Sequence, residues 1–88
     1  MVWKIEFTKK AQKQINKLDN PIRSNIKRAI LDRLVIDPKQ YLIQLKGDKK
    51  EFYKFRISDY RLLCHLNEDR LYILVIKVKH RKDVYINS

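Results

Sequence analysis

Several residue types are scarce in this chain of 88 residues, and each scarcity excludes a kind of structure. One glycine and two prolines are too few for a flexible linker or a low-complexity segment. A single cysteine, Cys64, excludes an internal disulfide and a metal site built from paired cysteines. No apolar run is long enough for a signal peptide or a membrane span. We therefore expect one soluble domain over residues 1–88, located in the cytoplasm.

Acidic residues are also few, because 10 Asp and Glu stand against 21 Lys and Arg, for a net charge of +11. Hydrophobic residues make up 44% of the chain, which is ordinary for a folded globule. A positive excess of this size favours polyanionic partners: nucleic acid, the ribosome, an anionic membrane or an acidic protein. Charge alone does not choose among them.

The first part of the sequence predicts one strand and two helices. Residues 2–7 alternate polar and apolar side chains, which is typical of a half-buried strand. Thr8 is a suitable N-cap for a helix whose apolar residues are three and four positions apart. A second helix begins at Pro21 and ends before the Asp-Pro pair at 37–38, since a residue before proline avoids the helical conformation.

The second part predicts three strands, at residues 52–57, 60–66 and 71–78, joined by short turns and therefore antiparallel neighbours. The last of them, LYILVIKV, is apolar on both faces, as in a central strand that is covered on each side. Residues 40–51 are expected to form a loop with one short extended piece. The order βααβββ predicts a two-layer α+β fold, with the N-terminal strand and a helical hairpin packed on an antiparallel sheet.

The segment FYKFRISDYRLL, residues 52–63, is typical of a β-hairpin with a two-residue loop. That loop sets Arg56 opposite Arg61 and leaves Lys54 on the same face. Like charges opposite each other in a sheet cost roughly a few tenths to 1 kcal/mol. Either these side chains splay into solvent and keep the protein soluble, or they converge on a phosphate that replaces their repulsion with charge-assisted hydrogen bonds.

The last apolar strand is followed by the basic tail KHRKDVY. The run YKFRISDYRLL, an apolar strand and then HRKDVY, after one strand and two helices, resembles the RelE branch of the RelE/ParE toxin superfamily. The similarity covers essentially the whole chain in the order of elements, with agreement of motifs over residues 53–85. It implies a RelE-like fold and the toxin of a bacterial type II toxin–antitoxin pair.

The resemblance implies a ribosome-dependent endoribonuclease that inhibits translation. Such toxins enter the ribosomal A site and cut the mRNA there without a metal or cofactor: the ribose 2′-OH attacks the adjacent phosphate and leaves a 2′,3′-cyclic phosphate and a 5′-OH. The family's catalytic positions fall on Lys54, Arg56, Arg61, Arg81 and Tyr85.

Each of these side chains suits a step of that reaction. Lys54 is the candidate base, or the group that orients the nucleophile. Arg61 would hold the non-bridging oxygens of the phosphate, and Arg81 would stabilise charge at the phosphate and the leaving oxygen. Tyr85 would stack on a nucleotide or orient it. Some RelE toxins carry lysine at the position of Arg56, and arginine does not give up a proton readily.

A histidine in the tail is the expected substitute as general acid, so His80 is included among the catalytic candidates. Either His80 or Arg81 is then the proton donor. His65 neighbours Cys64 in sequence, but adjacent strand residues point to opposite faces, so neither a metal site nor a Cys–His nucleophilic pair is expected.

Further basic residues are expected to bind RNA or the ribosome: Lys13, Arg23, Lys27, Arg28, Lys77, Lys79 and Lys82. The resemblance also implies a RelB-like antitoxin as partner. Two alternatives stay open at this point. One is a ParE-like toxin, which shares the fold and inhibits DNA gyrase, and the other is a noncatalytic RNA-binding module.

Overall fold

The N-terminal part of the molecule is a strand followed by two helices. In the computed structural model, which describes residues 3–82, β1 (Lys4–Phe7) leads into α1 (Lys9–Asn16) and α2 (Asn20–Ala29). The Thr8 hydroxyl caps α1 by accepting a hydrogen bond of 3.1 Å from the backbone N–H of Ala11, as predicted.

The second helix differs in its last turn from the helix expected there. α2 passes directly into a π-helical turn, η1 (Ile30–Leu34), in which the N–H of Val35 donates to the carbonyl of Ile30 at 3.0 Å. The apolar face predicted for this helix is still buried in the π turn, where Ile30 and Leu34 both lie in the core. π turns are rare, occur mostly as single turns within helices and are frequent at functional sites.

The segment between the helices and the hairpin holds three short elements. They are α3 (Pro38–Tyr41), the two-residue strand β2 (Ile43–Gln44) and the 3-10 turn η2 (Gly47–Lys49). The extended piece predicted in this loop is confirmed as β2, whereas α3 was not expected. Gly47 has a φ of +71°, a left-handed conformation in which a side chain would be strained.

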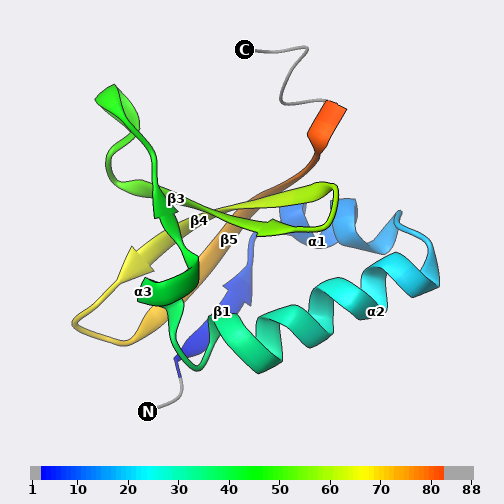
Figure 1. Cartoon of the computed structure of the whole chain (residues 1–88), viewed down its shortest axis with the longest axis horizontal. Helices are drawn as coiled ribbons and strands as arrows, with labels where there is room; N and C mark the ends of the chain where they lie inside the picture. Colours follow the sequence, from blue (N-terminus) through cyan, green and yellow to red (C-terminus); the bar gives the residue numbers. More distant parts are fainter. Residues whose placement is uncertain (1–2, 83–88) are drawn as a thin grey trace.

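Three long strands complete one five-stranded sheet. β3 (Phe52–Ile57), β4 (Tyr60–Asn67) and β5 (Tyr72–His80) are antiparallel neighbours, and the order across the sheet is β1-β5-β4-β3-β2. The N-terminal strand pairs with β5 in the parallel sense. Figure 1 shows β5 between β1 and β4, as expected of a central strand. The α+β architecture predicted from the sequence is confirmed.

The hairpin register also agrees with the prediction. Arg56 pairs with Arg61 and Lys54 with Leu63, while Phe55, on the other face, pairs with Leu62. Because side chains alternate along a strand, one face of the hairpin is apolar and the other carries the cations.

The core lies between the helices and one face of the sheet. α1 and α2 contribute Ala11, Ile15 and Ile26, which belong to one buried cluster with the strand residues Phe55, Leu62, Cys64, Ile73 and Val75. At roughly 1.5–3 kcal/mol for each large apolar side chain, this burial is the main source of stability. The helices cover only one face, so the second layer expected over β5 is wrong for the described residues: Leu74 and Ile76 on the other side are half-buried.

A β-bulge interrupts the pairing of β4 with β5. Leu63 pairs with Lys77 and Cys64 with Val75, so Ile76 is the extra residue. Two side chains, one at the start of α1 and one within it, form hydrogen bonds with the backbone of β5 beside the bulge. The Thr8 hydroxyl donates to the Ile76 carbonyl at 2.9 Å, and the Gln14 side-chain oxygen accepts from the Val78 N–H at 2.7 Å. The bulge thus brings Ile76 and Lys77 together on the face of the sheet that the helices do not cover.

Candidate active site

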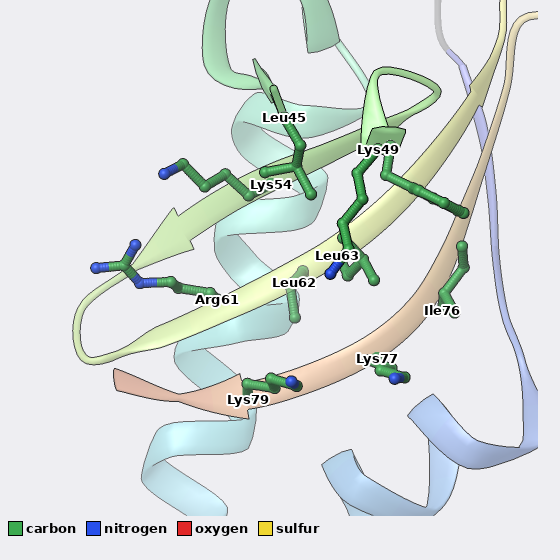
Figure 2. Close-up of a pocket in the computed structure, with 10 residues that line it drawn as sticks. Leu45, Lys49, Lys54, Arg61, Leu62, Leu63, Ile76, Lys77 and Lys79 are labelled. Carbon is green, nitrogen blue, oxygen red and sulfur yellow. The ribbon is translucent and has the colours of Figure 1, made fainter. Parts of the chain in front are cut away.

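The face of the sheet opposite the helices carries a cavity of about 540 Å³. Figure 2 shows most of its lining side chains projecting from β3, β4 and β5, with Leu45 and Lys49 coming from the segment before β3 and α2 lying behind the sheet. Cations and apolar residues line it in equal measure: Lys49, Lys54, Arg61, Lys77, Lys79, Leu45, Phe52, Leu62, Leu63 and Ile76. A cavity of this size and lining suits a ligand that has both negative charge and an apolar surface.

The register of the sheet explains why the cations meet. Lys79 is the partner of Arg61 across the β4–β5 ladder, and Lys77 is the partner of Leu63, which in turn faces Lys54. Lys54 and Arg61 are therefore diagonal neighbours, with Cα atoms roughly 7–8 Å apart. Figure 2 shows both side chains extending to the same side of the molecule. The site is built on adjacent strands, which position side chains more firmly than loops do.

The electrostatics of the cavity are one-sided. No aspartate or glutamate is among its lining residues. The ion pairs within the described part of the chain, Lys39–Glu68 and Arg81–Asp59, involve none of the cavity's cations. Five like charges without a counter-ion raise the free energy of the unliganded site, and a phosphate lowers it by accepting their hydrogen bonds.

Part of the cavity was not anticipated from the sequence. Lys49 belongs to the turn η2, and the apolar floor includes Leu45 and Phe52 on either side of it. Residues 45–51 show no helical or strand periodicity, so the sequence did not predict that they lie against β3, β4 and β5. Lys77 and Lys79, expected as general RNA contacts, lie in the cavity itself.

Arg56 does not line this cavity, although it faces Arg61 across the ladder. β2 pairs with β3 only as far as Lys54, so Arg56 is on an uncovered edge. It instead lines a second cavity of about 260 Å³ against α2 and η1. Arg56 thus shares a face with Lys54 and Arg61, as predicted, but it is not among the residues that line their cavity, and its catalytic role stays a prediction.

Arg81 lies beside the hairpin loop, one position beyond the paired end of β5. Its backbone N–H donates to the carbonyl of Asp59, and its guanidinium Nη1 is 3.9 Å from the Asp59 carboxylate. The side chain is 60% exposed, so this ion pair is weak and the guanidinium can reorient. The main-chain contact holds Arg81 at the hairpin end of the sheet, near Arg61 and Lys79.

The structure does not bring His80 to the cationic face. β5 continues to His80 rather than ending at residue 78, and the strand's alternation turns this side chain to the same face as Val78. Its ring contacts Tyr60 edge-on at 5.0 Å between centroids, and Nδ1 accepts a hydrogen bond from the Lys82 N–H. The expectation that His80 substitutes as the acid in the cluster is wrong for this arrangement. Tyr85 lies outside the described residues.

The other basic residues expected to bind RNA lie outside the cavity. Most are exposed: Lys13, Lys27, Arg28 and Lys82. Arg23 is half-buried and donates hydrogen bonds to Asn20 and to the carbonyl of Asn16. Arg28 lines the same second cavity as Arg56.

The cysteine and the acidic residues offer no alternative chemistry in the described region. Cys64 is fully buried in the core, and burial raises the pKa of its thiol to about 12, so it stays protonated and unreactive. Residues 3–82 contain no group of three His, Cys, Asp or Glu side chains close enough to hold a metal ion. No helix among them is long and apolar enough to cross a membrane.

Comparison with known proteins identifies the family. Residues 5–85 match the family described as the ParE toxin of the type II toxin–antitoxin system parDE. The chain is a toxin of the RelE/ParE superfamily. A search of curated proteins found no match.

Solved structures place the toxin's fold with the RelE type. The toxin–antitoxin complex RelBE2 from Mycobacterium tuberculosis matches with a TM-score of 0.86 at 21% identity, covering 92% of this chain and 100% of that one. The isolated Escherichia coli RelE toxin matches with a TM-score of 0.73 at 25% identity, covering 97% and 93%. The RelE–RelB complex from the archaeon Pyrococcus horikoshii gives 0.69 at 24% identity, covering 92% and 97%. The resemblance inferred from the sequence motifs is confirmed.

Proposed function

We propose that this toxin is a ribosome-dependent endoribonuclease that cuts mRNA in the A site and so inhibits translation in the cytoplasm. The observation that carries the proposal is the concentration of Lys54, Arg61, Lys77 and Lys79 around one cavity with no acidic residue in its lining. RNA supplies what such a cavity lacks, because each phosphate carries a negative charge and each base offers an apolar face.

The proposed reaction needs a base for the 2′-OH, hydrogen-bond donors for the phosphate oxygens and a proton donor for the 5′-oxygen. Lys54 orients the ribose 2′-OH and, in its neutral form, accepts the proton as the 2′-oxygen attacks phosphorus. Arg61 donates hydrogen bonds to the non-bridging oxygens as the phosphorus becomes five-coordinate. The bond from phosphorus to the 5′-oxygen then breaks, and that oxygen takes up a proton. The products are a 2′,3′-cyclic phosphate and a 5′-OH.

The proton for the 5′-oxygen is best supplied by Lys79. It faces Arg61 directly across the ladder, and an ammonium can release a proton that a guanidinium keeps. Arg81, at the same end of the sheet, stabilises the developing negative charge once it leaves Asp59. These cations take the part that a metal ion plays in other nucleases, so the reaction is proposed to be metal-independent.

Phe52 supports binding of the substrate rather than the chemistry. Its ring lines the cavity, is half-buried and contacts His65 edge-on at 6.1 Å between centroids. A fixed aromatic ring beside a cationic cluster is a suitable platform for a nucleobase, a contact worth roughly 1–3 kcal/mol for each stacked base. Tyr85 is proposed as a second platform.

An antitoxin is the second proposed partner. The Mycobacterium tuberculosis and Pyrococcus horikoshii relatives were solved as complexes with their antitoxins. A RelB-like protein with acidic or amphipathic segments would complement the net charge of +11. An antitoxin that covers the cavity would prevent RNA phosphates from binding there.

Inhibition of DNA gyrase is the competing function, and the ParE description of the matching family favours it. Toeprinting in a purified translation system, run beside a gyrase supercoiling assay, decides between the two. The nuclease proposal expects breaks within codons in the A site, only when ribosomes are present, and no effect on gyrase. Intact mRNA together with gyrase-dependent DNA cleavage would assign the toxin to the other function.

A further inference from the structure

A second basic hollow lies between the end of the hairpin and the helical layer. It has a volume of about 260 Å³, and three of its lining residues are arginines: Arg28 from α2, Arg33 from η1 and Arg56 from β3. Arg28, Arg33 and Arg56 are all exposed. The remaining lining is Asn25, Ala29, Asp32, Ser58 and one apolar core residue, Ile57.

The π turn explains how two of these arginines come to share the hollow. In an α-helix the residue stacked above Arg28 is four positions on, at Asp32. In the π turn the hydrogen bond joins residues five apart, so each turn holds more residues than an α-helical turn, which moves Arg33 back toward the position above Arg28. A helix with regular α geometry would turn Arg33 further away. An uncommon backbone feature therefore assembles this site.

The charges of the hollow are not matched within the protein. The ion pairs formed among residues 3–82 are Lys39–Glu68 and Arg81–Asp59, so Asp32 pairs with none of the three arginines. One carboxylate against three guanidiniums leaves an excess of two positive charges. Planar guanidiniums that are free on two sides of a hollow suit a tetrahedral oxyanion, because each can donate two parallel hydrogen bonds.

The hollow adjoins the cavity proposed for cleavage. Arg56 and Arg61 face each other across the β3–β4 ladder, and Arg61 lines the first cavity while Arg56 lines the second. Partners in a ladder have Cα atoms roughly 4.5–5.5 Å apart. The two basic sites thus form one path around the edge of β3. Cations spread over two adjoining sites match a polyanion better than they match a single carboxylate.

We infer that the Arg28, Arg33 and Arg56 hollow binds a backbone phosphate of single-stranded RNA next to the cut nucleotide. The inference rests on the proposed function, since it takes the RNA that runs through the first cavity as the ligand. It assigns Arg56 to binding the strand rather than to the chemistry of cleavage.

The test is binding of a fluorescent 2′-O-methyl RNA dodecamer, which cannot be cut, to the full chain by anisotropy at several salt concentrations. The variants are Arg56→Ala and the pair Arg28→Ala with Arg33→Ala. Loss of these charge-assisted hydrogen bonds should weaken binding roughly tenfold. It should also lower the slope of log affinity against log salt by about 0.7 for each phosphate contact removed.

Arg70→Ala is the matched control. Arg70 is exposed in the β4–β5 turn, and its removal changes the net charge by the same amount as Arg56→Ala. Arg56→Lys should keep most of the salt slope but lose affinity, because an ammonium cannot form the two parallel bonds. Circular dichroism melting shows whether each variant is folded at the assay temperature.

The outcomes separate this inference from the proposed function. Weakened RNA binding by the hollow variants, with Arg70→Ala near wild type, supports the site even if the wild-type toxin cuts no mRNA on ribosomes. Hollow variants that bind RNA as Arg70→Ala does overturn it, even if cleavage is intact. Normal RNA binding with weakened binding of a glutamate-rich peptide also overturns it, because the site is then a contact for an acidic protein.

Discussion

The hydrogen bond from the Val78 N–H to Gln14 allows a direct test of how the fold positions the cavity. β1 ends at Phe7, whose partner is Val75, so from Ile76 onward no strand covers that edge of β5. Gln14 covers it instead, with its side-chain oxygen 2.7 Å from the Val78 nitrogen. The substitution Gln14→Met keeps the length of the side chain and removes the acceptor.

The expected cost follows from leaving one backbone donor without a partner. An unsatisfied buried N–H costs about 1–3 kcal/mol, and since Gln14 is only half-buried, we expect about 1–2 kcal/mol for this variant. Each kcal/mol lowers the melting temperature of a domain of this size by roughly 4–8 °C. Cleavage should also fall at temperatures where the variant is fully folded, because the loosened strand carries Lys77 and Lys79.

Thermal and urea unfolding measure the stability, and single-turnover cleavage on programmed ribosomes measures the activity. Gln14→Glu is the control, because its carboxylate retains an acceptor at the same place. A Gln14→Met variant as stable as wild type would refute the role of this bond. So would a Gln14→Glu variant that loses as much stability as Gln14→Met.

Three further predictions concern single side chains. Arg61→Ala should slow cleavage on ribosomes by at least about 100-fold. It should change the free energy of unfolding by less than about 1 kcal/mol, since the loss of Arg61 relieves repulsion from Arg56. An unfolded variant would contradict the assignment of Arg61 to the open face. Lys27→Ala should weaken ribosome binding more at low salt than at high salt, measured by filtration, whereas Lys39→Ala, which loses an ion pair with Glu68, should not show that salt dependence. The raised pKa of Cys64, about 12 against an ordinary 9.0, means that the unfolded thiol ionises first, so the contribution of Cys64 to the stability of the fold should be constant below pH 9 and fall as the pH rises toward 12. Urea titrations at pH 8 and pH 10 should show a loss of about 1 kcal/mol that Cys64→Ala lacks, and an equal loss in that variant would assign the effect to other groups.

The hairpin was predictable because its determinants are local. A two-residue loop fixes the pairing of every residue on both strands, and alternation then assigns each side chain to a face. The facing of Arg56 and Arg61, and of Lys54 and Leu63, therefore followed from counting. The helix starting at Lys9 was similarly marked by its Thr8 cap.

The features that the sequence did not reveal depend on distant contacts or on a single extra residue. The parallel pairing of β1 with β5 joins the two ends of the chain, and no local signal records it. The bulge at Ile76 and the π turn at Ile30 each insert one residue into an otherwise regular element. Each changes which side chains share a face, and both occur beside the basic cavities.

Two site residues have neighbours that the sequence did not show, for simple reasons. His80 was treated as part of a tail, but the strand continues to that residue and its alternation directs the ring toward Tyr60. The register of Arg56 was predicted correctly, but register alone did not show that it also lines the second hollow. β2 leaves that part of β3 uncovered, so Arg56 can reach the second hollow beside α2. Alternation gives the face of a residue but not what lies beyond the edge of a sheet.

The ends of the cut RNA test most directly whether cations alone drive the reaction by attack of the ribose 2′-OH. The wild-type toxin is washed with EDTA before it is added to programmed ribosomes. We predict that the upstream RNA fragments end in a 2′,3′-cyclic phosphate and that the downstream fragments begin with a 5′-OH, as measured by mass spectrometry. Fragments with a 3′-OH and a 5′-phosphate would show that water attacks instead, and would contradict the assignment of Lys54 and Arg61.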